Sequence, residues 1–159
     1  MTGRPPETHR SLWRCPRCGQ TFVSRNLPHS CQVVGLDAFF ADAAPQLREL
    51  FDLFVAAAEA NGPVTLNATK SRVTLQVAFR FAAVERPRKA HLAAHFVLTR
   101  PLESPRLTVE SLKPYYHVHK LQLRSPADVD AELTGWLAEA YGVGERRHLS
   151  DRDWPRVRV

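Results

Sequence analysis

The chain has 159 residues, of which 44% are hydrophobic and 24% are charged, and its formal net charge is +6. This length and apolar content predict one globular domain with its own core and exclude a largely disordered protein. The longest apolar run, LFVAAAEA, is far shorter than the ~20 residues that span a bilayer, and the N-terminus lacks the apolar region of a secretory signal, so we expect a cytoplasmic protein without a membrane partner.

Charge is distributed unevenly along the chain. Residues 62–125 carry eleven Lys or Arg and three acidic residues, whereas residues 126–145 carry five acidic residues and no Lys or Arg. This segregation favours a negatively charged partner, such as a nucleic acid.

The first predicted element is a metal-binding knuckle over residues 13–35, preceded by a flexible leader over residues 1–12. All three cysteines of the chain lie in the knuckle, within the motifs CPRCG and HSC. Two residues between two thiols allow both sulfur atoms to reach one ion, and three thiolates with one imidazole are a usual ligand set for structural Zn²⁺. In a reducing compartment, an odd cluster of thiols indicates a metal rather than disulfides. The predicted zinc ligands are Cys15, Cys18, His29 and Cys31, under a small apolar cap formed by Trp13 and Phe22.

Two alternatives to structural zinc fit the sequence less well. A redox CxxC motif would lie between a strand and a helix of a βαβ unit, which the pattern does not predict. A nucleobase deaminase would need an H-x-E motif ahead of its P-C-x-x-C motif, and the chain has no H-x-E.

Helices follow the knuckle. A short helix is predicted from Asp37, and a longer one over residues 45–60, with Pro45 in its first turn and Asn61-Gly62 at its end. The apolar residues of the longer helix recur every three or four positions and form one stripe: Leu47, Leu50, Phe51, Phe54 and Val55.

Strands are predicted after residue 63. Apolar and polar residues alternate over residues 72–81. This pattern predicts a single half-buried strand, with Phe79 and Phe81 on its apolar face. Residues 89–98, 105–112 and 115–124 predict three more strands, and a helix with an apolar stripe is predicted to begin at the capping signature Ser125–Asp128. The sequence therefore predicts an α+β domain over residues 36–145, in which helices pack on one face of an antiparallel sheet and a C-terminal helix closes the fold. A basic tail, residues 146–159, follows it.

The polar face of this predicted sheet is basic and provides a candidate nucleic-acid surface. Cationic side chains can follow a phosphate backbone, although no exposed aromatic residue is predicted there for base stacking, and a solvated basic face is the alternative. The candidate residues on the sheet and the knuckle are Arg14, Arg17, Arg25, Arg72, Arg80, Lys120 and Arg124.

A second candidate site involves the histidines of the last strand. His117 and His119 are expected to be semi-buried and hydrogen-bonded, but with Tyr115 they could instead line a pocket where a neutral imidazole acts near pH 7. The chain has no G-x-S-x-G, H-E-x-x-H, P-loop or G-x-G-x-x-G motif, so we assign no catalytic residue and do not favour an enzyme.

Three functions therefore remain open at this point. A continuous convex basic surface would favour nucleic-acid binding, and an enclosed concave site would favour a small-molecule binder or an enzyme. A third possibility is a docking module for another protein, which would expose an apolar patch near Trp13 and Phe22. The leading expectation is a zinc-containing binding or regulatory protein with nucleic acid as its partner.

Several motifs resemble a known family. The segments CPRCGQTF and HSC, then LRELFDLFVAA, FRFAAV and HVHKLQLRSPADVDAEL, resemble the bacterial, largely actinobacterial, domain-of-unknown-function family number 5655 over roughly residues 13–148. The resemblance implies the same architecture, an N-terminal zinc knuckle followed by the α+β domain, and it implies no activity.

Overall fold

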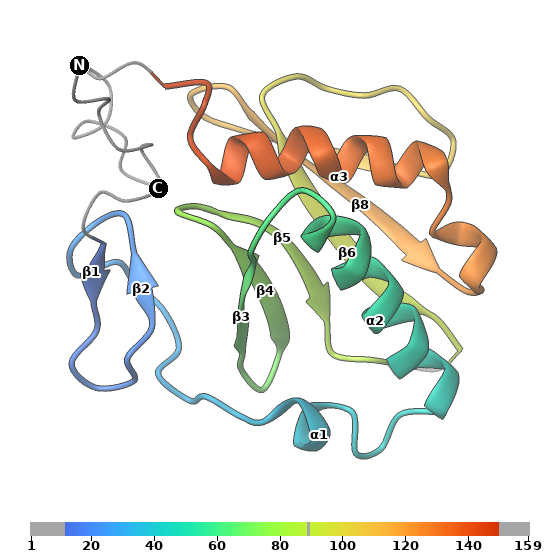
Figure 1. The fold of residues 1–159 in the computed structure, drawn as a ribbon, viewed down its shortest axis with the longest axis horizontal. Helices are drawn as coiled ribbons and strands as arrows, with labels where there is room; N and C mark the ends of the chain where they lie inside the picture. Colours follow the sequence, from blue (N-terminus) through green and yellow to red (C-terminus); the bar gives the residue numbers. More distant parts are fainter. Residues whose placement is uncertain (1–11, 89, 150–159) are drawn as a thin grey trace.

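The computed structural model describes residues 12–88 and 90–149. Its main element is a six-stranded antiparallel sheet with the strand order β3-β4-β5-β6-β8-β7 (Figure 1). The first four strands follow one another directly, whereas β7 lies at the edge beyond β8. The strands are β3 (Thr65–Ala68), β4 (Arg72–Gln76), β5 (Arg80–Glu85), β6 (Leu92–Leu98), β7 (Thr108–Leu112) and β8 (Tyr116–Leu123).

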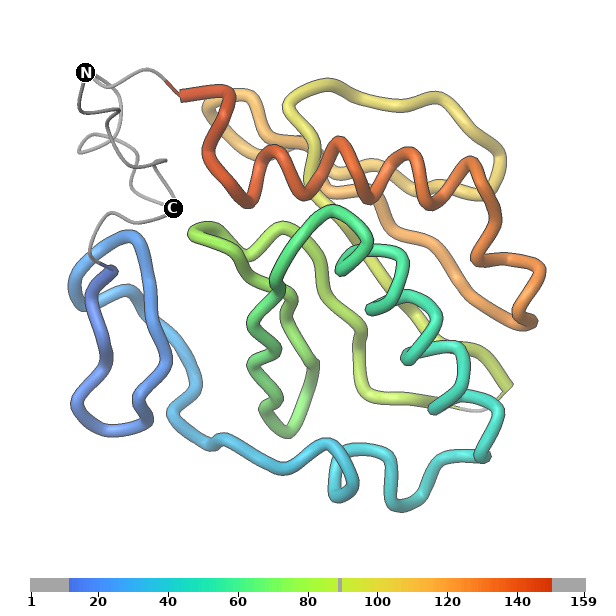
Figure 2. The backbone as a smooth tube through the Cα atoms, viewed as in Figure 1, coloured from blue at the N-terminus to red at the C-terminus, as the bar shows by residue number. Residues whose placement is uncertain are grey.

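Helices cover one face of this sheet. After the short α1 (Leu36–Phe39), the helices α2 (Pro45–Glu59) and α3 (Ala131–Gly144) lie side by side across the sheet (Figures 1 and 2). The side chain of Asp130 caps α3 by accepting a hydrogen bond of 2.9 Å from the Leu133 amide. The α+β architecture predicted from the sequence is confirmed.

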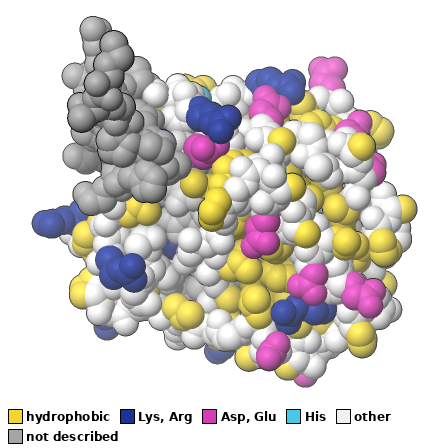
Figure 3. Space-filling model, viewed as in Figure 1, with side chains coloured by type: hydrophobic (Ala, Val, Ile, Leu, Met, Phe, Trp, Pro, Cys, Tyr) yellow, Lys and Arg dark blue, Asp and Glu magenta, His cyan; other side chains and the backbone are white. Residues whose placement is uncertain are grey.

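The core lies between these helices and the sheet. The predicted apolar stripe of α2 is buried as expected, and it packs with residues such as Phe81 and Phe96 from the sheet and Leu133 from α3. The face formed by α2 and α3 carries scattered acidic side chains (Figure 3). Helix α2 lies within residues 36–61, which carry five acidic residues and one Arg, and α3 lies within the acidic segment 126–145.

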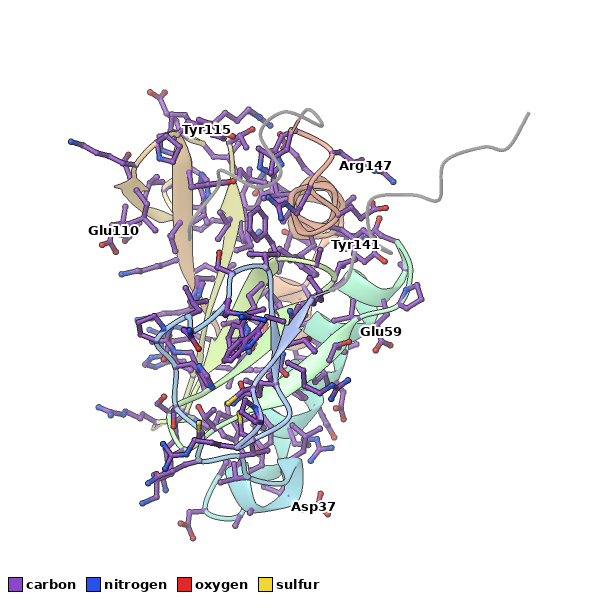
Figure 4. All side chains as sticks on the ribbon, turned by 90° about the vertical axis from the view of Figure 1, so that its left-hand side faces the viewer. Asp37, Glu59, Glu110, Tyr115, Tyr141 and Arg147 are labelled. Carbon is purple, nitrogen blue, oxygen red and sulfur yellow. The ribbon has the colours of Figure 1, made fainter. Side chains whose placement is uncertain are left out.

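The other face of the sheet, called here the open face, is polar. Paired residues form a row across five strands: Asn67, Thr74, Ala83, His95 and Lys120. In Figure 4 the helices lie on one side of the sheet, and Glu110 on β7 points away from them on the other side.

The single strand predicted over residues 72–81 is wrong, because this segment forms the β4–β5 hairpin. The amides of Ala78 and Phe79 both donate to the carbonyl of Gly144 at 2.9 Å, so the end of α3 fixes the turn. Phe79 consequently leaves the main core and packs with Tyr116 and Val143 in a second, smaller cluster.

Two further details differ from the prediction. Ser125 and Asp128 form the predicted capping box, but they cap a 3₁₀ turn, Pro126–Asp128, and the helix itself starts after Asp130. The short edge strand β3 was not predicted.

The start of the predicted tail packs on the domain. Arg146 is buried, with its guanidinium 4.5 Å from the centre of the Phe79 ring, and Leu149 belongs to the same small cluster. Residues 1–11 of the predicted leader and residues 150–159 of the predicted tail lie outside the described residues. Within residues 12–88 and 90–149, none of the helices has the length and apolar character needed to cross a membrane.

Candidate functional site

The knuckle is a small hairpin at the start of the described chain. Its strands β1 (Trp13–Arg14) and β2 (Thr21–Phe22) pair antiparallel, and the turn between them carries Cys15 and Cys18. The Cys15 amide donates to the Gln20 carbonyl and the Gly19 amide to the Cys15 carbonyl, both at 2.9 Å. Gly19 has a φ of 76°, a conformation that favours glycine. The sequence CPRCG therefore folds so that both thiols face the same point.

The second half of the knuckle brings His29 and Cys31 to that point. One ligand atom from each of Cys15, Cys18, His29 and Cys31 lies within 4.8 Å of all the others, so the four residues could hold a metal ion. The sulfur atoms gather in the knuckle (Figure 4). The Sγ atoms of Cys15 and Cys31 are 3.8 Å apart, and His29 Nε2 is 3.4 Å from Sγ of both Cys18 and Cys31.

Hydrogen bonds orient these ligands. His29 Nδ1–H donates to the Leu27 carbonyl at 2.6 Å, which leaves the Nε2 lone pair directed at the thiols. The Gln20 amide group donates to Cys18 Sγ at 3.2 Å and to the Ser30 carbonyl at 2.8 Å, and so it joins the two halves of the knuckle.

Electrostatics in the cluster favour a bound cation. Burial raises the pKa of the Cys15 thiol, but hydrogen bonds from the backbone of Arg17 and Cys18 and from the side chains of Cys18 and His29 together outweigh burial. They lower this pKa to about 6. Burial, followed by the neighbouring Cys15 and Cys18, raises the pKa of Cys31 to about 11. The crowded thiols resist full ionisation together, and a divalent cation would relieve this repulsion because the thiolate is the metal-binding form.

The knuckle packs against the open face of the sheet. A register shift between Leu75 and Gln76 places Arg80 opposite Gln76, and both side chains reach the knuckle. Gln76 Nε2 donates to the Thr21 carbonyl and Arg80 Nη2 to Gln20 Oε1, each at 2.9 Å. The Arg80 guanidinium also lies 4.3 Å from the centre of the Phe22 ring.

The aromatic cap of the knuckle is therefore an internal feature. Phe22 is only 3% exposed, and its ring centre is 6.0 Å from that of Trp13 and 4.4 Å from that of His29. The cap forms as predicted. The exposed patch expected for a docking module is not present at Phe22, because the sheet covers this ring.

A polar cleft of about 390 Å³ separates part of the knuckle from the open face. Pro28, His29 and Ser30 of the knuckle line one side. The strands supply two cations, Arg72 and Arg80, and the hydrogen-bonding side chains of Asn67, Ser71, Thr74 and His95. Burial, then the charges of Arg72 and Lys120, lower the pKa of His95 to about 4, so its imidazole is neutral at pH 7.

The structure places the seven predicted nucleic-acid residues on the knuckle and on or beside strands of the sheet. Arg80 packs under the knuckle, and Arg17 and Arg25 are exposed on it. The remaining four interact with neighbours: Arg14 with the Gly19 carbonyl, Arg72 with Glu85, Lys120 with Glu110, and Arg124 with Gln122.

The three residues of the predicted histidine pocket lie in different surroundings. His119 is fully buried on the helix side of the sheet, stacked on Phe96, and its Nε2 accepts a 3.0 Å hydrogen bond from the Leu102 amide. His117 Nδ1 and the Ser111 hydroxyl are 2.9 Å apart, and Tyr115 is 40% exposed. Both histidines therefore have hydrogen-bond partners, as the sequence analysis expected for side chains with a structural role.

Together, the fold and the site define a class: an α+β domain, with helices on one face of an antiparallel sheet, that carries a Cys₃His cluster able to hold a metal. Residues 36–144 match the model of the family described as "Domain of unknown function (DUF5655)", and the chain belongs to this family. The match begins after the knuckle. The comparisons found no match to a curated protein or to a solved structure.

Proposed function

We propose that this protein is a zinc-containing ligand-binding protein whose cleft takes a small anionic molecule. The observation that carries the proposal is the placement of Arg72 and Arg80 in a concave polar cleft, one side of which is formed by residues 28–30 of the knuckle. Small-molecule sites are typically concave, with a few well-placed polar groups.

The cluster geometry supports Zn²⁺ as the metal. A tetrahedral ion with Zn–S of about 2.3 Å and Zn–N of about 2.0–2.1 Å has S–S edges of about 3.8 Å and S–N edges of about 3.5 Å. The Cys15 and Cys31 Sγ atoms are 3.8 Å apart, and His29 Nε2 is 3.4 Å from Sγ of Cys18 and of Cys31. Four protein ligands complete the tetrahedron and leave no position for water, so the ion has a structural role.

The chemistry of the cleft favours a carboxylate or phosphate group. Guanidinium groups recognise these anions with charge-assisted, often bidentate hydrogen bonds. Arg80 Nε is buried and has no hydrogen-bond partner within the described part of the chain. The hydroxyl of Ser71 adds a neutral donor beside the cations, whereas the Thr74 hydroxyl donates to the Asn67 carbonyl at 3.5 Å.

Inorganic phosphate is the first probe for this cleft. In ¹⁵N-labelled, zinc-loaded full-length protein, phosphate should shift the backbone signals of Ser71 and Thr74, and Arg72→Gln should weaken this binding at least several-fold. Arg48→Gln is the matched control, because Arg48 lies on α2 and pairs with Asp37 and Asp52. Unchanged cleft signals in the wild type, or equal affinity in Arg72→Gln, would contradict the proposal.

Nucleic acid is a second candidate, favoured by the exposed cations Arg17 and Arg25 on the knuckle. Labelled single- and double-stranded DNA and RNA, titrated at two salt concentrations, should bind less tightly at high salt if phosphates are contacted. Replacing both arginines by glutamine should weaken binding without lowering the zinc content. Equal affinity in the double variant would exclude this surface.

A further inference from the structure

A second cavity, also of about 390 Å³, lies beside the cleft. It is bounded by the knuckle, the β4–β5 turn, and residues from α3, β6 and the β7–β8 region. Its walls are mostly apolar side chains, among them Phe22, Val23, Ala78, Phe79, Leu112 and Val143. An apolar cavity of this size suits part of a small organic molecule.

The two cavities adjoin each other. They share the side chains of Phe22, Leu27, Arg80 and Val97. Arg80 therefore borders an apolar space on one side and a polar, cationic space on the other. Lys113 contributes another cation to the lining of the apolar cavity.

We propose that the two cavities form one binding site for an amphipathic organic anion. The acidic group binds at Arg80 and Arg72, and the apolar body, an aliphatic chain or an aromatic ring, fills the second cavity. This assignment rests on the proposed function, because it takes the cleft as the anion site. It extends that function by naming the ligand class and by including Leu112 and Val143, which do not line the cleft.

Two properties of the site select this class. A small inorganic anion would leave the apolar cavity unfilled, and a neutral apolar molecule would not use the two guanidinium groups. Each methylene group buried in an apolar site increases affinity about four-fold, which corresponds to the ~0.8 kcal/mol gained per methylene. Affinity should therefore rise with the length of an acyl chain until the cavity is full.

The probes are acetate, butanoate, hexanoate and octanoate, with octanol as the uncharged counterpart, titrated by calorimetry or by NMR into zinc-loaded full-length protein. We expect affinity to rise about fifteen-fold at each step of the series, because each step adds two methylene groups, until the cavity is full. Octanol should bind at least ten-fold more weakly than octanoate. Leu112→Ser should weaken octanoate several-fold and leave phosphate binding unchanged. Leu53→Ser is the control, because Leu53 is an exposed leucine on α2.

The outcomes separate this inference from the proposed function. Phosphate binding in the cleft with no gain along the acyl series would overturn the inference and leave the proposed function standing. Octanol that binds as tightly as octanoate would overturn the role of the arginines in binding this ligand. Failure of both phosphate and octanoate to bind would overturn both proposals.

Discussion

Replacing Cys18 by serine should cost the protein its metal and unfold the knuckle, while the sheet stays folded. Zinc binding supplies much of the folding energy of a small metal module, so the loss of one ligand removes that energy. The sheet has its own core with α2 and α3, and the Cys18 thiol is not part of that core.

The effect on the sheet can be estimated from the contacts that would disappear. The Arg80–Gln20 hydrogen bond has a charged donor and contributes about 1.5–3 kcal/mol, and the neutral Gln76–Thr21 hydrogen bond contributes about 0.5–1.5 kcal/mol. The Arg80–Phe22 cation–π contact adds about 0.5–2 kcal/mol. The free energy of unfolding of the sheet domain should therefore fall by roughly 2.5–6.5 kcal/mol, compared with the 5–15 kcal/mol typical of a domain.

The assay combines metal analysis with circular dichroism and urea unfolding at 25 °C. Cys18→Ser should contain no stoichiometric zinc, keep the far-ultraviolet signal of the sheet and helices, and unfold at a lower urea concentration. Ser30→Ala is the control, because its exposed side chain is in the same knuckle and is not a ligand. Collapse of the whole chain in Cys18→Ser, or full zinc retention, would refute the reasoning.

Three other substitutions test the fold. Gly144→Ala should destabilise the protein by about 1–3 kcal/mol, because a Cβ atom there would lie 2.6 Å from a ring carbon of Phe81. Tyr141→Phe should cost about 0.5–1.5 kcal/mol in urea unfolding, because it removes the 2.9 Å hydrogen bond to the Pro63 carbonyl. His95 has a folded-state pKa of about 4, below its ordinary value of 6.5, so the unfolded chain takes up its proton first and stability falls as the pH drops. Between pH 7 and pH 5.5 this loss should be about 1 kcal/mol, and it should be absent in His95→Gln.

Each of these three predictions has its own contradicting result. Wild-type stability in Gly144→Ala would mean that the Phe81 ring moves aside at no cost. An unchanged free energy of unfolding in Tyr141→Phe would show that the Pro63 carbonyl forms an equally favourable hydrogen bond with water. An identical pH dependence in wild type and His95→Gln would show that this imidazole is not protected from protonation.

Local patterns in the sequence predicted the elements whose structure depends on near neighbours. The apolar stripe of α2 lies on one face of a single helix, and the alternation in β6 places Leu92, Ala94, Phe96 and Leu98 on the buried side. The spacing of the cysteines and His29 similarly brought together the cluster that could hold a metal. Each of these features is encoded within one short segment.

The features that were missed depend on contacts between distant residues. The turn between β4 and β5, residues 77–79, contains no glycine, proline or asparagine. It is held by hydrogen bonds from the amides of Ala78 and Phe79 to the Gly144 carbonyl. Two hydrogen bonds join the knuckle to the sheet, Thr21 with Gln76 and Gln20 with Arg80. Their partners are 55 and 60 residues apart in the sequence. No motif marks these pairs, so the cleft between knuckle and sheet could not be predicted.

The Gln20 side chain joins the metal cluster to the sheet, since it contacts Cys18, Ser30 and Arg80. Residues in contact tend to change together during evolution, so these contacts should be detectable in an alignment of related sequences. Among relatives of this chain, glutamine at position 20 and arginine at position 80 should covary. In a relative without the four metal ligands, the arginine would lose both its amide partner and its aromatic ring, and selection would no longer preserve it.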